Sequence, residues 1–146
     1  MARIGIDLGT TNSVVAMVYD DGAHVVPRGR GRVIPSTVFF RGKGGADDVV
    51  VGEEAERWMA EGRVVRSVKR LMGRTYAEAL AEKSDKYFRP SGGSVRLIKR
   101  GENDVGLAIG DEGRAQTLWP HEVSAWVLRE ARAHAERSLG RAIWET

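Results

Sequence analysis

The sequence predicts a mixed α/β protein in which a three-stranded antiparallel meander and one long helix flank an inserted α+β lobe. Three observations carry this prediction. Residues 3–26 alternate apolar and polar positions between two turn signals, residues 120–139 show the apolar periodicity of a long helix, and the stretch between them mixes short strand and helix patterns. We therefore expect residues 1–35 and 118–146 to form one incomplete subdomain and residues 36–117 to form a lobe inserted into it.

The first predicted strand leads into the most informative stretch of the chain. Ile4, Ile6 and Leu8 alternate with polar residues and glycine, which is the period of two that a half-buried strand shows. Asp7 therefore leaves the strand on the face opposite the apolar side chains. Residues 9–12 then suit a tight reversal, because glycine permits positive φ and asparagine tolerates left-handed conformations.

This reversal, formed by Gly9, Thr10, Thr11 and Asn12, offers backbone N–H groups and two hydroxyls to one concavity, an arrangement that suits a phosphate chain. Asp7 beside it could hold a hydrated Mg²⁺, since this ion commonly binds protein through one or two carboxylates and keeps water and phosphate oxygens as its other ligands. An ordinary hairpin turn is the alternative. The strand-to-helix phosphate loop is excluded, because no Gly-x-x-x-x-Gly-Lys-Ser/Thr sequence occurs and a strand follows.

Several short strands and one helix are expected next. Strand patterns occupy residues 13–19, 23–26, 34–40 and 49–51. The first two are joined by an Asp-Asp-Gly turn, which is a strong hairpin signal. Residues 53–61 have the pattern of a helix, with Gly52 as an acceptable N-cap and two glutamates in the first turn, where the positive end of the helix dipole favours them.

Residues 64–72 carry apolar side chains at helical spacing, so a second helix is predicted there. On its helical wheel Lys69 borders the apolar side, from which its stem can cover apolar surface while its ammonium reaches a neighbouring cleft. Thr75 and Glu78 match a capping box that begins a short third helix. A polar connection at residues 84–93 and then a small meander of strands at residues 94–99, 105–109 and 114–117 are expected.

The longest helix is predicted from Pro120, a residue favoured at the first helical position, to Leu139, with Gly140 beyond it. A broad apolar arc suits packing across a sheet; it consists of Val123, Val127, Leu128, Ala131, Ala135 and Leu139. His121 and His134 have no further ligands at metal-binding spacing, so we expect both histidines at the surface.

Composition limits the classes of function. The 146-residue chain is 42% hydrophobic and 29% charged, which is typical of a globular domain. No apolar run approaches the ~20 residues of a membrane span, and no signal peptide precedes the first strand. The chain has no cysteine for a disulfide or a thiolate metal site. We therefore expect a cytoplasmic protein with no membrane partner.

The net charge of +3 leaves a nucleic-acid partner open as an alternative. Arg28, Arg30 and Arg32 alternate with glycine, as in the Arg-Gly segments that wrap RNA. A solvated loop between strands is the preferred interpretation, because the segment is short and contains no aromatic residue. The competing hypothesis is a small basic nucleic-acid-binding module, which would show salt-sensitive RNA binding.

Six stretches of the chain resemble one family. Residues 5–13, Gly-Ile-Asp-Leu-Gly-Thr-Thr-Asn-Ser, are similar to the first phosphate motif of the heat shock protein 70 family, the DnaK-type chaperones, within the actin-like ATPase superfamily. Further similar stretches, in the family's order and at roughly its spacing, are residues 34–36, 51–55, 68–74, 122–128 and 135–140. Another actin-like ATPase or a sugar kinase relative is the alternative within this fold.

The resemblance implies a ribonuclease H-like, actin-like ATPase fold, of which this chain would be the first half only. It implies that residues 9–12 contact the β- and γ-phosphates of ATP, that Asp7 holds Mg²⁺ through water, and that Lys69 acts near the γ-phosphate and the attacking water. In the whole protein, ATP hydrolysis would drive the folding of unfolded polypeptides together with co-chaperones.

The resemblance covers only the opening part of the family's ATPase domain. The end of the chain at Thr146, just before an expected strand, favours a fragment. We expect such a fragment to bind ATP weakly and to hydrolyse it negligibly, because it lacks the adenosine contacts and the other wall of the cleft. Since its first strand would lack one neighbour, a homodimer through this unpaired sheet edge is also expected.

Overall fold

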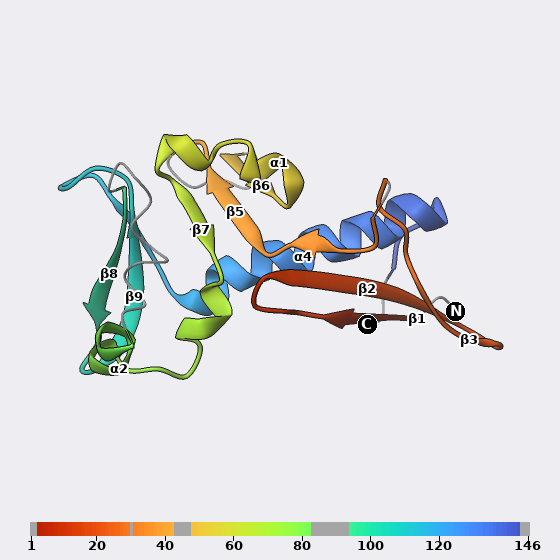
Figure 1. Ribbon diagram of the computed structural model, residues 1–146, viewed down its shortest axis with the longest axis horizontal. Helices are drawn as coiled ribbons and strands as arrows, with labels where there is room; N and C mark the ends of the chain where they lie inside the picture. The colour runs from red at the N-terminus through yellow and green to blue at the C-terminus, as the bar shows by residue number, and fades with distance from the viewer. Residues whose placement is uncertain (1–2, 30, 43–47, 83–93, 144–146) are drawn as a thin grey trace.

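The computed structural model describes residues 3–29, 31–42, 48–82 and 94–143. Its N-terminal strands lie beside one long helix, and a separate group of strands lies beyond the start of that helix (Figure 1). Within these residues the strands form three antiparallel sheets, so the fold is mixed α/β as predicted. The predicted polar connection at residues 84–93 lies outside the described residues. No helix in the described ranges combines the length and the apolar character that crossing a membrane requires.

The first sheet is the predicted meander. It consists of β1 (Arg3–Asp7), β2 (Asn12–Tyr19) and β3 (Gly22–Val25), with the short β4 (Ile34–Pro35) also paired to β2. In the register of the first pair, Gly5 lies opposite Ala16 and Asp7 lies opposite Val14. Ile4 is buried whereas Asp7 is exposed, which confirms the alternation predicted for the first strand.

The second sheet corrects the prediction of a helix over residues 64–72. Its strand order is β6 (Val49–Val51), β5 (Thr37–Phe40) and β7 (Val64–Arg66). Val64 and Val65 pair with Phe39 and Val38 of the central strand, so these β-branched residues are buried in a sheet. Ser67 then adopts a left-handed conformation, with φ 55°, and only a 3₁₀ turn, η3 (Val68–Leu71), follows.

The helix predicted over residues 53–61 is interrupted. The chain forms α1 (Glu53–Glu56) and then a separate 3₁₀ turn, η2 (Met59–Glu61). Trp58, between the two, stacks on Phe39 with a ring-centroid distance of 5.3 Å and an interplanar angle of 6°. This packing against the second sheet accompanies the break in the helix.

The third sheet confirms the second predicted meander. β9 (Asp104–Ile109) lies between β8 (Val95–Arg100) and β10 (Gln116–Leu118). The short helix α2 (Tyr76–Ala81) packs against β8 and β9, and its capping box is present: the Glu78 N–H donates to Thr75 Oγ1 and the Thr75 N–H donates to Glu78 Oε2.

The long helix α4 (Pro120–Leu139) has the predicted bounds, and Gly140 ends it with φ 66°. The residue that precedes the helix has no capping side chain, but its backbone N–H donates to Glu122 Oε2 at 2.6 Å. Two predictions about its faces are wrong. Leu128, which the sequence predicts in the apolar arc that packs on a sheet, is 38% exposed. His134, which the sequence predicts at the surface, is 9% exposed, and its ring Nε2–H donates to the Pro27 carbonyl oxygen at 3.1 Å.

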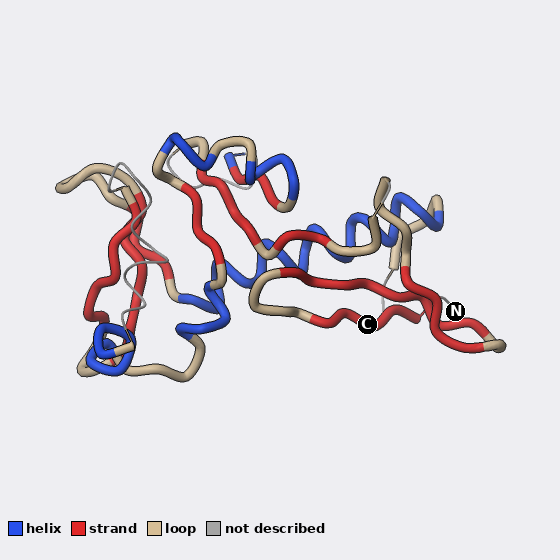
Figure 2. Tube along the Cα trace, in the orientation of Figure 1, coloured by secondary structure: helices blue, strands red, loops and turns tan. Residues whose placement is uncertain are grey.

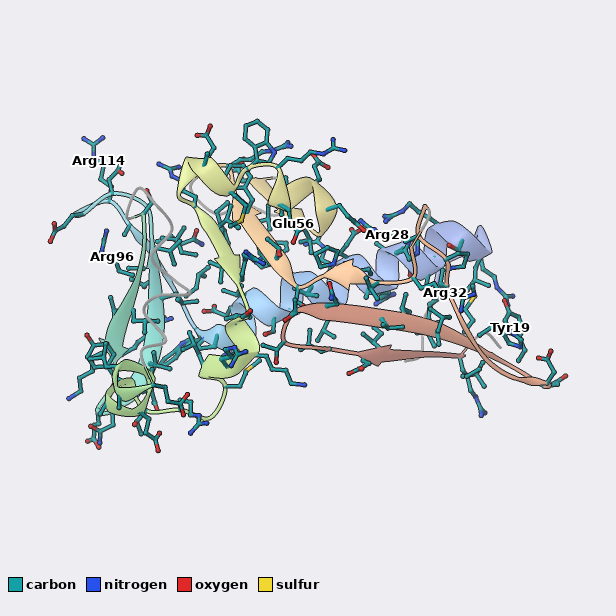
Figure 3. The ribbon with its side chains drawn as sticks, viewed as in Figure 1. Tyr19, Arg28, Arg32, Glu56, Arg96 and Arg114 are labelled. Carbon is teal, nitrogen blue, oxygen red and sulfur yellow. The ribbon has the colours of Figure 1, made fainter. Side chains whose placement is uncertain are left out.

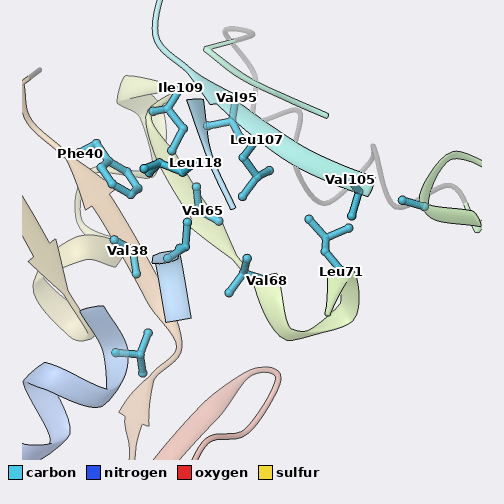
Figure 4. Packing of buried hydrophobic residues seen from close by; sticks show 13 residues of the cluster. Val38, Phe40, Val65, Val68, Leu71, Val95, Val105, Leu107, Ile109 and Leu118 are labelled. Atoms are coloured by element: carbon cyan, nitrogen blue, oxygen red, sulfur yellow. The ribbon is translucent and has the colours of Figure 1, made fainter. Parts of the chain in front are cut away.

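Figure 2 shows the long helix running beside the strands of the first sheet. Two hydrophobic clusters include side chains of this helix. Ala131 and Ala135, in its second half, pack with Ile4 and Val15 of the first sheet. Val123 and Val127, in its first half, belong to a larger cluster that joins the second and third sheets (Figure 4). The segment predicted as an inserted lobe therefore shares its core with α4.

Candidate functional site

The turn between β1 and β2 is so tight that it requires glycine. A Cβ atom placed on Gly9 would lie 1.9 Å from the backbone carbonyl oxygen of Asn12 and 3.1 Å from its carbonyl carbon. Both atoms belong to the backbone, so a side-chain rotation cannot relieve the clash. Gly9 thus permits the close approach of the two ends of the loop formed by residues 9–12. Because the sequence predicts that this loop binds phosphate, we call it the phosphate loop.

Three backbone carbonyls in and beside the phosphate loop accept hydrogen bonds from distant parts of the chain. Lys69 Nζ donates to the Leu8 carbonyl at 2.7 Å. Ser36 Oγ donates to the Gly9 carbonyl at 2.9 Å, and the Ser36 backbone N–H donates to the Thr11 carbonyl at 2.8 Å. The loop is therefore held by two residues that follow their partners by 27 and 61 positions in the sequence.

These contacts also set the direction of the N–H groups in the phosphate loop. All described peptide bonds are trans, so each carbonyl points away from the N–H of the same peptide unit. The Gly9 and Thr10 N–H groups therefore point away from Lys69 and Ser36. Among the described residues, neither N–H has a hydrogen-bond acceptor. Two neighbouring donors without an acceptor form a local site suited to an anion.

Lys69 reaches the loop from the 3₁₀ turn η3, not from a helix. Val68 and Leu71 of this turn are buried in the larger hydrophobic cluster, whereas Lys69 is exposed. The two buried side chains fix the turn, and the lysine between them extends to the Leu8 carbonyl. Figure 1 shows this turn beside the end of the β1–β2 hairpin.

Asp7 is exposed at the end of β1, immediately before the phosphate loop. Among the described residues, no group of three or more acidic, histidine or cysteine side chains could enclose a metal ion. A single carboxylate fits a Mg²⁺ ion that keeps most of its water and also binds phosphate oxygens. It does not fit an ion held by protein ligands alone.

The predicted site residues lie on an open surface. Asp7, Thr11, Asn12 and Lys69 are exposed, and Thr10 is partly buried. A cavity of about 410 Å³ lies elsewhere, lined by residues of the 71–75, 104–105 and 119–121 segments. The arrangement offers hydrogen-bond donors to one side of a bound anion, and few side chains would exclude water from that anion.

The Arg-Gly segment is a structured turn in its described part. The Arg28 N–H donates to the Gly31 carbonyl at 2.9 Å, and the Gly31 N–H donates back to the Arg28 carbonyl at 2.8 Å. The Arg28 guanidinium binds Glu53 at 2.9 Å and Glu130 at 2.7 Å. Arg32 is exposed, and Arg30 lies outside the described residues (Figure 3).

Burial alone would lower the pKa of the Arg28 guanidinium, but its hydrogen bonds to Glu130 and Glu53 raise that pKa above the usual value. The same surroundings act on His134: burial, followed by the positive charge of Arg28, lowers the pKa of its imidazole. Arg28 thus joins the turn to α1 and α4. This role favours the structural interpretation of the segment over RNA binding.

Sequence reasoning missed two residues beside the phosphate loop. Ser36 and Ser13 are 4% and 0% exposed, and their Oγ atoms lie 2.9 Å apart. Ser36 falls in one of the motifs that resemble the family, but no local pattern indicates that its hydroxyl binds a carbonyl 27 residues earlier.

Comparison with known proteins agrees with the resemblance seen in the sequence. The family model described as Hsp70 protein matches residues 3–146. The proteins named Chaperone protein DnaK from Thermotoga petrophila and Thermotoga maritima are each 40% identical over 113 residues, which is 75% of this chain and 18% of theirs. The chain therefore spans about a fifth of the length of these relatives. Because the family match extends over nearly all of its residues, the chain belongs to the heat shock protein 70 family and corresponds to an N-terminal part of that family's ATPase domain.

Proposed function

We propose that this chain forms the part of an ATP site that binds the terminal phosphates. In this proposal Gly9, Thr10, Thr11 and Asn12 contact the β- and γ-phosphates through backbone N–H groups and hydroxyls. The observation that carries the proposal is the pair of N–H groups on Gly9 and Thr10, which lack acceptors among the described residues and are aimed by the contacts of Ser36 and Lys69.

Asp7 would hold the hydrated Mg²⁺, which when bound neutralises part of the phosphate charge. On binding, Lys69 would leave the Leu8 carbonyl and its exposed side chain would swing to the side of the Gly9 and Thr10 N–H groups to reach an oxygen of the γ-phosphate, because a lysine binds an anion more strongly than a neutral carbonyl. From there its ammonium would also orient the attacking water. Catalysis would rest on this positioning and on charge stabilisation.

In the whole protein the same site would hydrolyse ATP to ADP and phosphate and so drive the folding of unfolded polypeptides with co-chaperones. We further propose a cytoplasmic location and a ribonuclease H-like, actin-like architecture, of which this chain forms the first half. These statements rest on membership of the Hsp70 family. The division into residues 1–35 with 118–146, and 36–117, belongs to the same proposal.

The isolated chain is expected to bind Mg·ATP weakly, with a dissociation constant near 1 mM, and to show no measurable turnover, because the open site excludes little water. Titration followed by amide NMR should give saturable shifts at residues 9–12.

Lys69→Ala should weaken binding of Mg·ATP about tenfold, the loss expected for one charge-assisted contact. Lys99→Ala, which removes an exposed lysine on β8, is the matched control. Micromolar affinity by calorimetry, or no shift in the loop at millimolar ATP, would contradict the proposal.

A homodimer through the sheet edge is a second proposal, favoured by the sequence of β1. Among the described residues β1 pairs only with β2, so its outer edge is available. If two copies pair antiparallel about Gly5, Arg3 lies opposite the partner's Asp7, and Ile4 lies opposite the partner's Ile6. Apart from the central pair of glycines, each cross-strand pair is then complementary in charge or in apolar character.

Light scattering at tens of micromolar should therefore report a dimer. Arg3→Glu should shift the mass to the monomer, because it places two carboxylates opposite each other in both symmetry-related pairs. Arg114→Glu makes the same charge change on an exposed residue away from β1 and should leave the dimer intact. A monomeric unmodified chain under these conditions would rule out the proposed edge pairing.

A further inference from the structure

Ser36 occupies the junction between the first and second sheets. It lies between β4, which pairs with β2, and β5, which is the central strand of the second sheet. Its side chain is almost fully buried, with 4% of the residue exposed. Both its hydroxyl and its backbone N–H bind carbonyls of the phosphate loop, on Gly9 at 2.9 Å and on Thr11 at 2.8 Å.

The hydrogen-bond directions around Ser36 follow from its chemistry. A serine hydroxyl has one proton, and in Ser36 that proton is donated to the Gly9 carbonyl, which can only accept. The buried contact between Ser13 Oγ and Ser36 Oγ therefore requires Ser13 to be the donor. The result is a directed chain from Ser13 to Ser36 to Gly9, in which each bond polarises the next.

We propose that Ser36 is a positioning residue for the phosphate loop. By holding the Gly9 carbonyl, it turns the N–H of the same peptide unit, which belongs to Thr10, toward the place where a phosphate would bind. Without the hydroxyl, this peptide unit loses the only hydrogen bond to its carbonyl among the described residues. The proposal rests on the phosphate-binding function proposed above.

The position of Ser36 also explains why the contact is well defined. Pro35 lies opposite Asn12 at the end of the loop, and Thr37 begins a strand buried in the second sheet. Ser36 is therefore fixed from both sides before it touches the loop, and a fixed donor can orient a peptide unit that has no regular secondary structure of its own. If the second sheet moved relative to the first, Ser36 would transmit that movement to the phosphate loop.

The test compares Ser36→Ala, Ser36→Thr and Ser13→Ala with the unmodified chain. Ser36→Ala removes the donor to the Gly9 carbonyl, whereas Ser36→Thr retains a hydroxyl and should restore binding. Ser13→Ala is the matched control, because it removes an equally buried hydroxyl from the same chain of hydrogen bonds but leaves the contact with Gly9 in place. Thermal unfolding is measured for all variants, so that a general loss of stability is recognised.

Two readouts are taken. In titrations with Mg·ATP, Ser36→Ala should bind about tenfold more weakly than the unmodified chain, and Ser13→Ala should change affinity less than about threefold. In the free protein, ¹⁵N relaxation should show the order parameter of the Thr10 N–H falling from about 0.85 to below about 0.6 in Ser36→Ala only. A purely structural role would affect Ser13→Ala and Ser36→Ala alike.

The two readouts separate this inference from the proposed function. If the unmodified chain shows no response to Mg·ATP, the phosphate function fails, and the order parameters of the free protein still decide whether Ser36 orients the loop. If Ser36→Ala binds Mg·ATP like the unmodified chain, or if its loop order parameters are unchanged, Ser36 is not a positioning residue.

Discussion

Replacing Gly9 by alanine should lower the free energy of unfolding by about 2 to 3 kcal/mol and abolish the response of the phosphate loop to Mg·ATP. The new Cβ would lie 1.9 Å from the Asn12 carbonyl oxygen. The backbone at Asn12 cannot retreat easily, because it pairs with Pro35 while the neighbouring Thr11 carbonyl accepts the Ser36 N–H. The loop must therefore open, and the Thr10 N–H loses the direction that phosphate binding requires.

Gly5→Ala is the matched control for this substitution. Gly5 lies in the middle of β1, and a Cβ added there meets no atom within 4 Å. The free energy of unfolding of the Gly5→Ala protein should stay the same or rise by up to about 1 kcal/mol, because alanine loses less backbone entropy on folding than glycine. Urea denaturation compares the stabilities, and amide NMR titration compares the responses to ATP. Equal behaviour of the two variants would show that the close approach at Gly9 does not determine the loop.

The predictions that are confirmed rest on signals contained within one element. The alternation around Ile4 and Ile6 reveals a strand with one buried face, and the capping pair of Thr75 and Glu78 marks the start of α2. The proline and glycine at the ends of α4 fix both of its bounds. Each of these features depends on neighbours a few residues away, so the sequence reports it directly.

The helix predicted over residues 64–72 fails because a distant partner decides the conformation. Its apolar positions fit one side of a helix, yet Val64 and Val65 also fit the vacant edge of β5. Pairing with Val38 and Phe39 buries both valines in the sheet, and this burial outweighs a weak local preference. The pattern of a short apolar segment cannot distinguish these outcomes.

In the candidate site too, some features follow from the local sequence, and others depend on residues far apart in the chain. The position of Gly9 in a tight turn follows from the sequence, whereas the attachment of Ser36 and Lys69 to that turn depends on the tertiary fold. The helical wheel that placed Lys69 near a cleft describes a helix that does not form. The family resemblance places Lys69 near residues 9–12 through its motif and not through helical periodicity, and in the structure Lys69 Nζ binds the Leu8 carbonyl beside that loop.

His134 and Arg28 were misjudged for a related reason. Both residues have polar side chains on elements that look solvated in the sequence, yet they meet at the place where the turn after β3 crosses α4. These contacts join residues more than 100 positions apart, so the sequence around each residue does not predict them. Only the tertiary structure shows that Arg28 is engaged by two glutamates.

Phe40→Ala should lower the free energy of unfolding by about 3 to 5 kcal/mol, the loss expected when a large ring is removed from a rigid core. Phe40 is 1% exposed and belongs to the cluster that joins the second sheet, the third sheet and the first half of α4 (Figure 4). Since three separate elements hold the surrounding side chains, they cannot all move in to fill the space left by the ring.

Phe39→Ala is the matched control on the opposite face of the same strand. Phe39 packs in a small cluster with Ala55 and Val64 and stacks on Trp58, which is itself 38% exposed. Because water can reach the space that the ring leaves, the loss should be smaller, about 2 kcal/mol. Urea denaturation followed by circular dichroism should show one cooperative transition for both variants, since α4 joins the sheets through a common core. A larger loss for Phe39→Ala, or a separate early transition in Phe40→Ala, would mean that residues 36–117 fold around a core of their own.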